Sequence, residues 1–159
     1  MNKKDTVVFD LDGTLLDTLE DLKNSVNYAM TQCGYPEHTL DEVRRYVGNG
    51  ILLLMQRAIP EGKNDPNFDK AFTLFKEHYG KHCNDTTKPY AGIMELLHTL
   101  KENNIKIAIV SNKADFAVKE LNAIYFKDLI LVAIGEKESE GIRKKPAPDT
   151  VIEALKQLG

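Results

Sequence analysis

Two carboxylates separated by one residue, Asp10 and Asp12, follow the apolar run Val7-Val8-Phe9 and precede a Gly13-Thr14 turn. The apolar run predicts a buried strand of a parallel sheet, over about residues 6–12. Because side chains two apart on a strand point to one face, we expect the two acids to project together. At a strand end, such a pair can hold a hard cation and divide the roles of nucleophile and acid/base.

The Asp12-Gly13 pair also has a purely structural interpretation, since Asp-Gly favours tight β-hairpins. A hairpin requires an alternating strand after the turn. The residues from Leu15 to Leu22 instead drift into helical periodicity, which favours the catalytic interpretation.

Composition excludes few classes of protein. The chain has 159 residues, 42% hydrophobic and 28% charged, which is typical of one globular domain. A net charge of −3 gives no reason to expect nucleic acid or an anionic membrane as a partner. No apolar run is long enough to span a membrane, and the residues before Asp10 do not have the pattern of a signal peptide. Cys33 and Cys83 lack Cys-x-x-Cys spacing and indicate a reducing cytoplasm.

Helical periodicity dominates residues of about 15–85. Thr39 with Glu42 predicts a capping box. Three apolar stripes predict longer helices, and they lie at Leu19–Cys33, Ile51–Ile59 and Phe68–Tyr79.

From about residue 88, helices and strands alternate. Strands are expected at 105–110 and 129–134, and helices at 93–100, 116–123 and 148–158. This alternation predicts right-handed crossovers and a parallel sheet. We therefore predict an α/β core domain formed by residues 1–14 and 88–159, interrupted by a helical domain of residues 15–87.

Two further segments carry polar residues that could do chemistry. Ser111-Asn112 ends the predicted strand at 105–110, and Lys145 precedes Pro146 in a basic run. Each has a structural alternative, because Ser111-Asn112 could cap the following helix and Lys145 could be a solvated charge.

Together these motifs resemble the haloacid dehalogenase superfamily, and within it the phosphoglycolate phosphatase group. The resemblance rests on Asp10-Leu11-Asp12-Gly13-Thr14, Ser111-Asn112-Lys113 and Lys145-Pro146-Ala147-Pro148-Asp149, in the family's order. It covers nearly the whole chain and implies a three-layer, Rossmann-like parallel sheet with an inserted helical cap.

The resemblance also implies roles. Asp10 would be the nucleophile that forms an aspartyl-phosphate, and Asp12 the general acid and base. Mg²⁺ would be held by Asp10 and by the backbone carbonyl of Asp12. Lys145 would neutralise charge on the nucleophile and phosphate. Ser111, with the backbone N–H of Asn112, would bind phosphoryl oxygens, and Thr14 would be a further substrate-binding residue.

A second set of substrate-binding residues is implied for the cap. Gly48-Asn49-Gly50 resembles the cap motif of the group, and Arg57 could read a substrate carboxylate. The alternatives are that the glycines form only a helix end and a turn, and that Arg57 is a surface arginine.

A fourth motif of the family, an acidic Gly-Asp-x-x-x-Asp-like loop, is not found before Gly159. We expect the strand beside the first strand to be absent, which would expose the first strand as an edge open to self-association. The expected function is a Mg²⁺-dependent phosphatase for a small, phosphoglycolate-like phosphate monoester, impaired in this chain. A sugar-phosphate mutase, a pyrophosphatase and an inactive truncated module remain alternatives.

Overall fold

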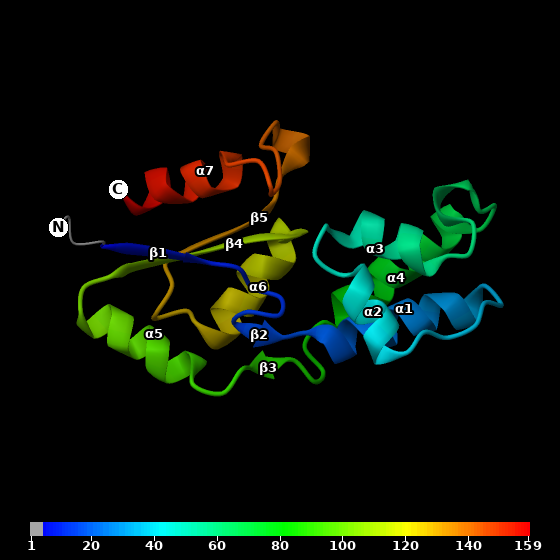
Figure 1. Cartoon of the computed structure of the whole chain (residues 1–159), viewed down its shortest axis with the longest axis horizontal. Coiled ribbons are helices and arrows are strands. Elements are labelled where there is room, and N and C mark those ends of the chain that lie inside the picture. The colour runs from blue at the N-terminus through cyan, green and yellow to red at the C-terminus, as the bar shows by residue number, and fades with distance from the viewer. Residues whose placement is uncertain (1–4) are drawn as a thin grey trace. The chain divides into compact units, whose positions relative to one another are not determined.

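The computed structural model describes residues 5–159, which form two compact units (Figure 1). One unit contains the residues up to Leu16 together with Pro89–Gly159, and the other contains Asp17–Lys88. Residues 1–4, the first residues of the predicted core domain and of the segment expected not to be a signal peptide, lie outside the described residues.

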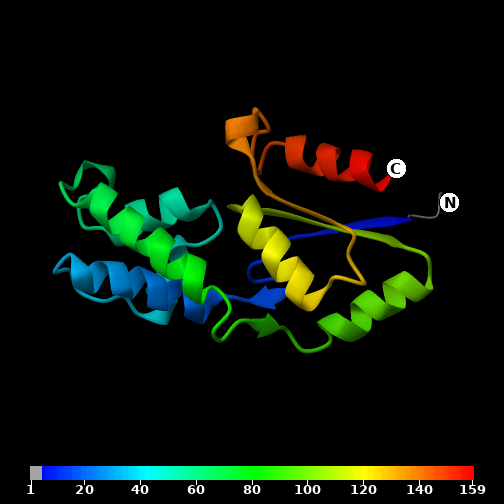
Figure 2. The same ribbon diagram turned by 180° about the vertical axis from the view of Figure 1, so that it is seen from behind.

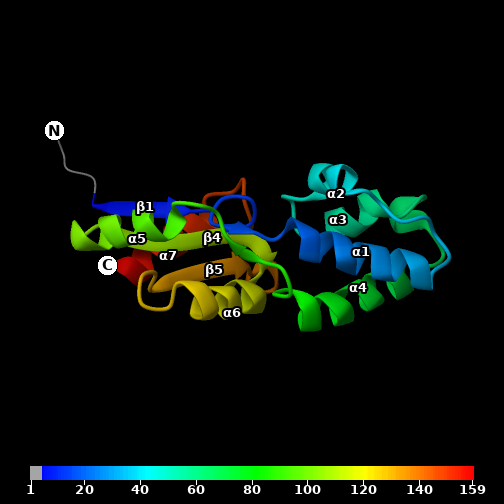
Figure 3. The same cartoon turned by 90° about the horizontal axis from the view of Figure 1, so that it is seen from below.

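The first unit is built on a three-stranded parallel sheet. Its strands are β1 (Thr6–Phe9), β4 (Lys106–Ala114) and β5 (Val132–Glu136), in the order β1-β4-β5 (Figure 3). Thr6 lies opposite Lys106 and Phe9 opposite Ile109, so the carboxyl ends of β1 and β4 meet at one edge. The predicted α/β class with a parallel sheet is therefore confirmed.

Helices cover both faces of this sheet (Figures 1 and 2). On one face, α5 (Ile93–Glu102) and α6 (Asp115–Tyr125) pack through Leu97 and Leu121 on Ile107 and Ile109. On the other face, α7 (Asp149–Leu158) packs through Ala154 on Ala108 and Val110. This alternation along β4 is what a strand buried on both faces requires.

Three strand boundaries differ from the predictions. The first strand ends at Phe9, so Asp10 and Asp12 lie in the following turn and not on a strand face. The turn closes through the carbonyl of Leu11, which accepts hydrogen bonds from the amides of Thr14 and Leu15. β4 continues to Ala114 through an irregular stretch, and β5 begins three residues later than predicted, at Val132 rather than residue 129.

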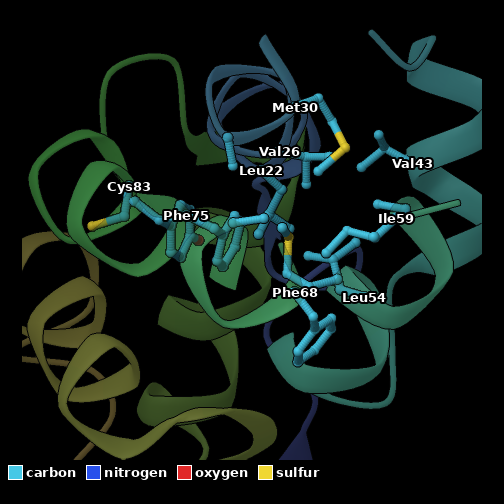
Figure 4. Packing of buried hydrophobic residues seen from close by; sticks show 14 residues of the cluster. Leu22, Val26, Met30, Val43, Leu54, Ile59, Phe68, Phe75 and Cys83 are labelled. Atoms are coloured by element: carbon cyan, nitrogen blue, oxygen red, sulfur yellow. The ribbon is translucent and has the colours of Figure 1, made fainter. Parts of the chain in front are cut away.

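The second unit is a small helical bundle. It contains α1 (Leu19–Gln32), α2 (Leu40–Tyr46), α3 (Ile51–Ala58), a 3-10 turn η1 (Gly62–Asn64) and α4 (Phe68–His82). The predicted capping box at Thr39 and Glu42 is present. Its apolar stripes form one core, which includes Leu22, Val26, Met30, Val43, Leu54, Ile59, Phe68 and Phe75 (Figure 4).

Two very short strands, which the sequence pattern did not reveal, lie where the chain passes between the units. β2 (Leu16–Asp17) and β3 (Lys88–Pro89) pair with each other. The remaining element, the 3-10 turn η2 (Glu138–Glu140), lies in the segment between β5 and α7. No helix of the described residues is long and apolar enough to cross a membrane.

Candidate active site

The turn after β1 places each of its two acids against a lysine. The Nζ atom of Lys145 donates to Asp10 Oδ1 at 2.9 Å, and the Nζ atom of Lys113 donates to Asp12 Oδ1 at 2.8 Å. The first pair is partly exposed, whereas the Lys113 side chain is only 3% exposed and that of Asp12 15%. The two carboxylates predicted to do chemistry therefore lie beside separate ammonium groups.

The segment that carries Lys145 is fastened to β4 by Asn112. The side-chain amide of Asn112 donates to the carbonyl of Lys145 at 3.1 Å, and its oxygen accepts the Lys145 N–H at 2.9 Å. Lys145 Nζ also donates to the carbonyl of Val110 at 3.0 Å. Because both ends of Lys145 are held by β4, its ammonium is directed toward Asp10.

Ser111 and Thr14 complete the set predicted for this edge of the sheet. Ser111 is 2% exposed, and its Oγ accepts the N–H of Lys113 at 3.2 Å. Thr14 is exposed in the turn after β1. Since β1 and β4 are parallel neighbours, the irregular end of β4 supplies Ser111, Asn112 and Lys113 to the same edge as the acids.

Lys113 is the contributor that sequence reasoning missed. The sequence pattern includes it in the Ser111-Asn112-Lys113 run but predicts no role for its side chain. A signal was available, because an ammonium next to a buried strand needs a counter-charge and the acidic turn offers one.

At this edge of the sheet, the backbone of β5 at Gly135 lies very close to the backbone at the start of α6. The N–H of Gly135 donates to Asp115 Oδ1 at 2.8 Å, and a Cβ at Gly135 would lie 2.4 Å from the Cα of Asp115. Burial opposes ionisation of Asp115, but hydrogen bonds from Lys119 and from the Gly135 amide lower its pKa overall. Only glycine allows β5 and the start of α6 to meet in this way.

In the helical unit, the structure brings the predicted substrate-binding residues together. Arg57 donates through Nη2 to Asn49 Oδ1 at 3.0 Å and through Nη1 to the carbonyl of Tyr46 at 2.8 Å. Gly48 and Gly50 adopt φ values of 121° and 89°, a region that favours glycine. Gly50 is also the residue from which α3 begins. An exposed, anchored guanidinium thus lies beside a glycine-bordered turn.

The oxygen atoms near Asp10 are of the kind that binds a hard cation, but there are few of them. The Asp10 carboxylate and the Asp12 backbone carbonyl are the oxygen ligands that Mg²⁺ prefers. Within residues 5–159, no group of three or more His, Cys, Asp or Glu side chains could hold a metal ion.

The fold and these contacts define a parallel α/β protein with two acid–lysine pairs at the carboxyl ends of its strands. The sequence profile of the haloacid dehalogenase-like hydrolase family matches residues 7–159, and the chain belongs to that family. The resemblance inferred from the motifs is therefore confirmed.

Several proteins similar to this chain are described as phosphoglycolate phosphatases. The phosphoglycolate phosphatase of Aquifex aeolicus is 32% identical over 157 residues, which cover 96% of this chain and 70% of that protein. The phosphoglycolate phosphatase of Thiobacillus denitrificans is 31% identical, covering 96% and 69%. A solved structure from Lactobacillus delbrueckii, of a protein predicted to be a phosphoglycolate phosphatase, is 34% identical with a TM-score of 0.91, covering 99% and 74%.

Proposed function

We propose that this protein is a phosphatase that hydrolyses a small, phosphoglycolate-like phosphate monoester through an aspartyl-phosphate on Asp10. The observation that carries the proposal is the pairing of Asp10 with Lys145 and of Asp12 with Lys113 at the carboxyl ends of adjacent parallel strands. The similarity to the phosphoglycolate phosphatases of Aquifex aeolicus and Thiobacillus denitrificans supports the choice of substrate.

The proposed reaction has two steps. In the first, an Asp10 oxygen forms a bond to phosphorus while the bond to the alcohol oxygen breaks, and Asp12 gives that oxygen a proton. In the second, Asp12 takes a proton from water as the water oxygen attacks phosphorus, which frees Asp10 and inorganic phosphate. Lys145, Ser111 and the backbone amide of Asn112 would stabilise the phosphoryl oxygens.

We propose Mg²⁺ as the cofactor, bound by Asp10 and the backbone carbonyl of Asp12. The cation would reduce repulsion between the carboxylate and the phosphate dianion. With one carboxylate and one carbonyl as protein ligands, we expect weak Mg²⁺ binding and low turnover by this 159-residue chain, because Mg²⁺ keeps its waters tenaciously.

We propose that residues 15–87 act as a cap over a core domain of residues 1–14 and 88–159. In this assignment, Arg57 reads the substrate carboxylate from beside Gly48, Asn49 and Gly50. The compact unit Asp17–Lys88 and its separate hydrophobic core support the assignment. Closure would exclude water during phosphoryl transfer.

We further propose a cytoplasmic location, consistent with the two free cysteines, and self-association through β1. Among the described strands β1 pairs only with β4, so its other edge can accept a strand. Light scattering tests this, and a monomer at all concentrations would contradict it.

The decisive experiment compares hydrolysis of 2-phosphoglycolate and para-nitrophenyl phosphate with and without Mg²⁺, with identification of the products. Release of inorganic phosphate and an alcohol is expected. Transfer of the phosphoryl group to a sugar, or cleavage of pyrophosphate alone, would replace the phosphatase assignment with another reaction.

A further inference from the structure

A buried carboxylate joins the two places where the chain enters and leaves the helical unit. Asp21, in the first turn of α1, is 1% exposed. It lies four residues after Asp17, where the chain enters the unit, and it contacts Thr86 and Thr87, just before the chain leaves at Lys88. These partners are 65 and 66 residues away along the chain.

The contacts occupy both oxygens of Asp21. Oδ1 accepts from the Thr86 amide at 3.0 Å and from the Thr86 hydroxyl at 2.8 Å. Oδ2 accepts from the Thr86 amide at 3.0 Å, the Thr87 amide at 2.9 Å and the Thr87 hydroxyl at 2.7 Å. A carboxylate held by this many neutral donors is a fixed link, because rotating its side chain would break several hydrogen bonds at once, among them the one from the amide of buried Thr87.

The two crossings, which are the segments by which the chain enters and leaves the helical unit, are joined by three sets of contacts. Beyond the short β2–β3 pairing, the Tyr90 amide donates to the Leu15 carbonyl at 3.1 Å. At the other end of the pairing, Asp21 holds Thr86–Thr87 to the start of α1. Two strands linked above and below cannot twist about their own backbone dihedrals independently, so the movable length is confined to the few residues between the links.

We propose that Asp21 is a positioning residue that holds the crossing at Lys88 to the crossing at Asp17, so that the two segments move together. This rests on the proposed function of residues 15–87 as a cap, and it restricts how such a cap can move. Asp21, Thr86 and Thr87 move with the helical unit, and the joint consists of Asp17–Thr18 on one crossing and Lys88–Pro89 on the other.

The test compares Asp21→Asn with a matched control in the same helical turn, Glu20→Gln. Among the described residues, Glu20 forms its ion pair with Lys23 and none with Thr86 or Thr87, so its variant changes one acid without touching the crossings. Hydrogen exchange reports the amides of Thr86 and Thr87, and residual dipolar couplings report whether the two units tumble together. Protection of the buried α1 residues Val26 and Met30 shows that the helical core remains folded.

We expect exchange at Thr86 and Thr87 to accelerate about tenfold or more in Asp21→Asn, because an amide oxygen replaces only one of the two charged acceptors. The alignment of the two units should diverge in that variant, and Glu20→Gln should match the wild type. Unchanged exchange, or faster exchange with the alignment of the two units unaltered, would overturn the proposal.

If Asp21→Asn loses protection at Val26 and Met30, the double variant Thr86→Val/Thr87→Val replaces it. This variant keeps the carboxylate and both amides and removes only the hydroxyls, so a smaller divergence of the same sign is expected and no divergence refutes the link. None of these readouts needs turnover. If the chain is inactive but the hydrogen bonds from Thr86 and Thr87 to Asp21 behave as expected, the result counts against the phosphatase proposal alone.

Discussion

Asp12 in the core unit and Asp21 in the helical unit are both shielded carboxylates, but they are satisfied in opposite ways. Asp12 is paired with the buried ammonium of Lys113, whereas Asp21 accepts hydrogen bonds from two amides and two hydroxyls. The ion pair of Asp12 joins two charged groups, whereas the contacts of Asp21 are short-range hydrogen bonds from neutral donors. Under the proposed function, the first arrangement suits an acid that takes part in phosphoryl transfer, and the second suits an acid that holds two segments together.

The largest expected effect is the loss of turnover when the proposed nucleophile, Asp10, is replaced. Asp10→Asn should reduce any Mg²⁺-dependent turnover by roughly 10⁴-fold or more, because the amide cannot act as the nucleophile. It should also abolish trapping of beryllium fluoride, observed by ¹⁹F NMR. Asp12→Asn should lower turnover comparably yet leave the trapped state detectable, and appreciable turnover by Asp10→Asn would rule out the assigned nucleophile.

Removing the ammonium from Asp12 should cost more stability than removing the one from Asp10. Lys113→Met leaves a shielded carboxylate without its ammonium and should lower the free energy of unfolding by about 3 kcal/mol. Lys145→Met opens a partly exposed pair and should cost below about 1 kcal/mol. Urea unfolding of the two variants measures the difference, and equal costs would contradict the distinction between the pairs.

The pH dependence of stability should carry the signature of Asp21. Burial opposes its ionisation, but hydrogen bonds from Thr87 and Thr86 outweigh burial and lower its pKa below the ordinary value of 3.8. Because the folded pKa is depressed, the stabilisation is fully present above 3.8 and is lost as pH falls through the folded pKa.

Unfolding of wild type and Asp21→Asn, followed by circular dichroism across this range, checks the sign. At pH 7 the variant should be less stable by about 1–3 kcal/mol, and the gap should close in acid. A gap that stays constant below pH 4 would show that the ionised form of Asp21 is not the stabilising species. His78, whose pKa is lowered by burial and by His82, is present in both proteins and cancels in the comparison.

The smallest expected effect is the loss of stability when one neutral hydrogen-bond donor to Asp21 is removed. Thr87→Val removes the hydroxyl that lies 2.7 Å from Asp21 Oδ2 and 3.1 Å from the Cys83 carbonyl, and it should cost about 1 kcal/mol. Thr87→Ser should restore most of this stability by returning the donor. Thermal unfolding of the two variants resolves this difference. A loss of similar size in Thr87→Ser would assign the effect to the methyl group instead of the hydrogen bond.

Local patterns were sufficient to predict most of the elements. The apolar run ending at Val110 predicted the central strand, the stripe from Leu19 predicted α1, and Thr39 with Glu42 predicted the start of α2. In each case, the residues that determine the element are neighbours in the sequence.

Long-range contacts could not be predicted in the same way. Lys113 pairs with Asp12 from 101 residues away, and Asp21 finds Thr86 and Thr87 in a segment with no periodicity. The place where β1 ends was also missed, because the Asp10–Leu15 turn is fixed by hydrogen bonds to the Leu11 carbonyl and not by hydrophobicity. Motif order could place residues at one edge of the sheet but could not say which lysine faces which acid.

The close approach at Gly135 sets a limit on sequence change that the rest of the site does not share. In a library of variants selected only for folding, position 135 should admit glycine alone, because any Cβ would collide with the backbone of Asp115. At Gly13 a Cβ meets no atom within 4 Å and only the φ of +76° is restrictive, so asparagine should survive there. Two glycines at the same edge of one sheet would thus differ in mutational tolerance, one limited by space and the other by backbone conformation.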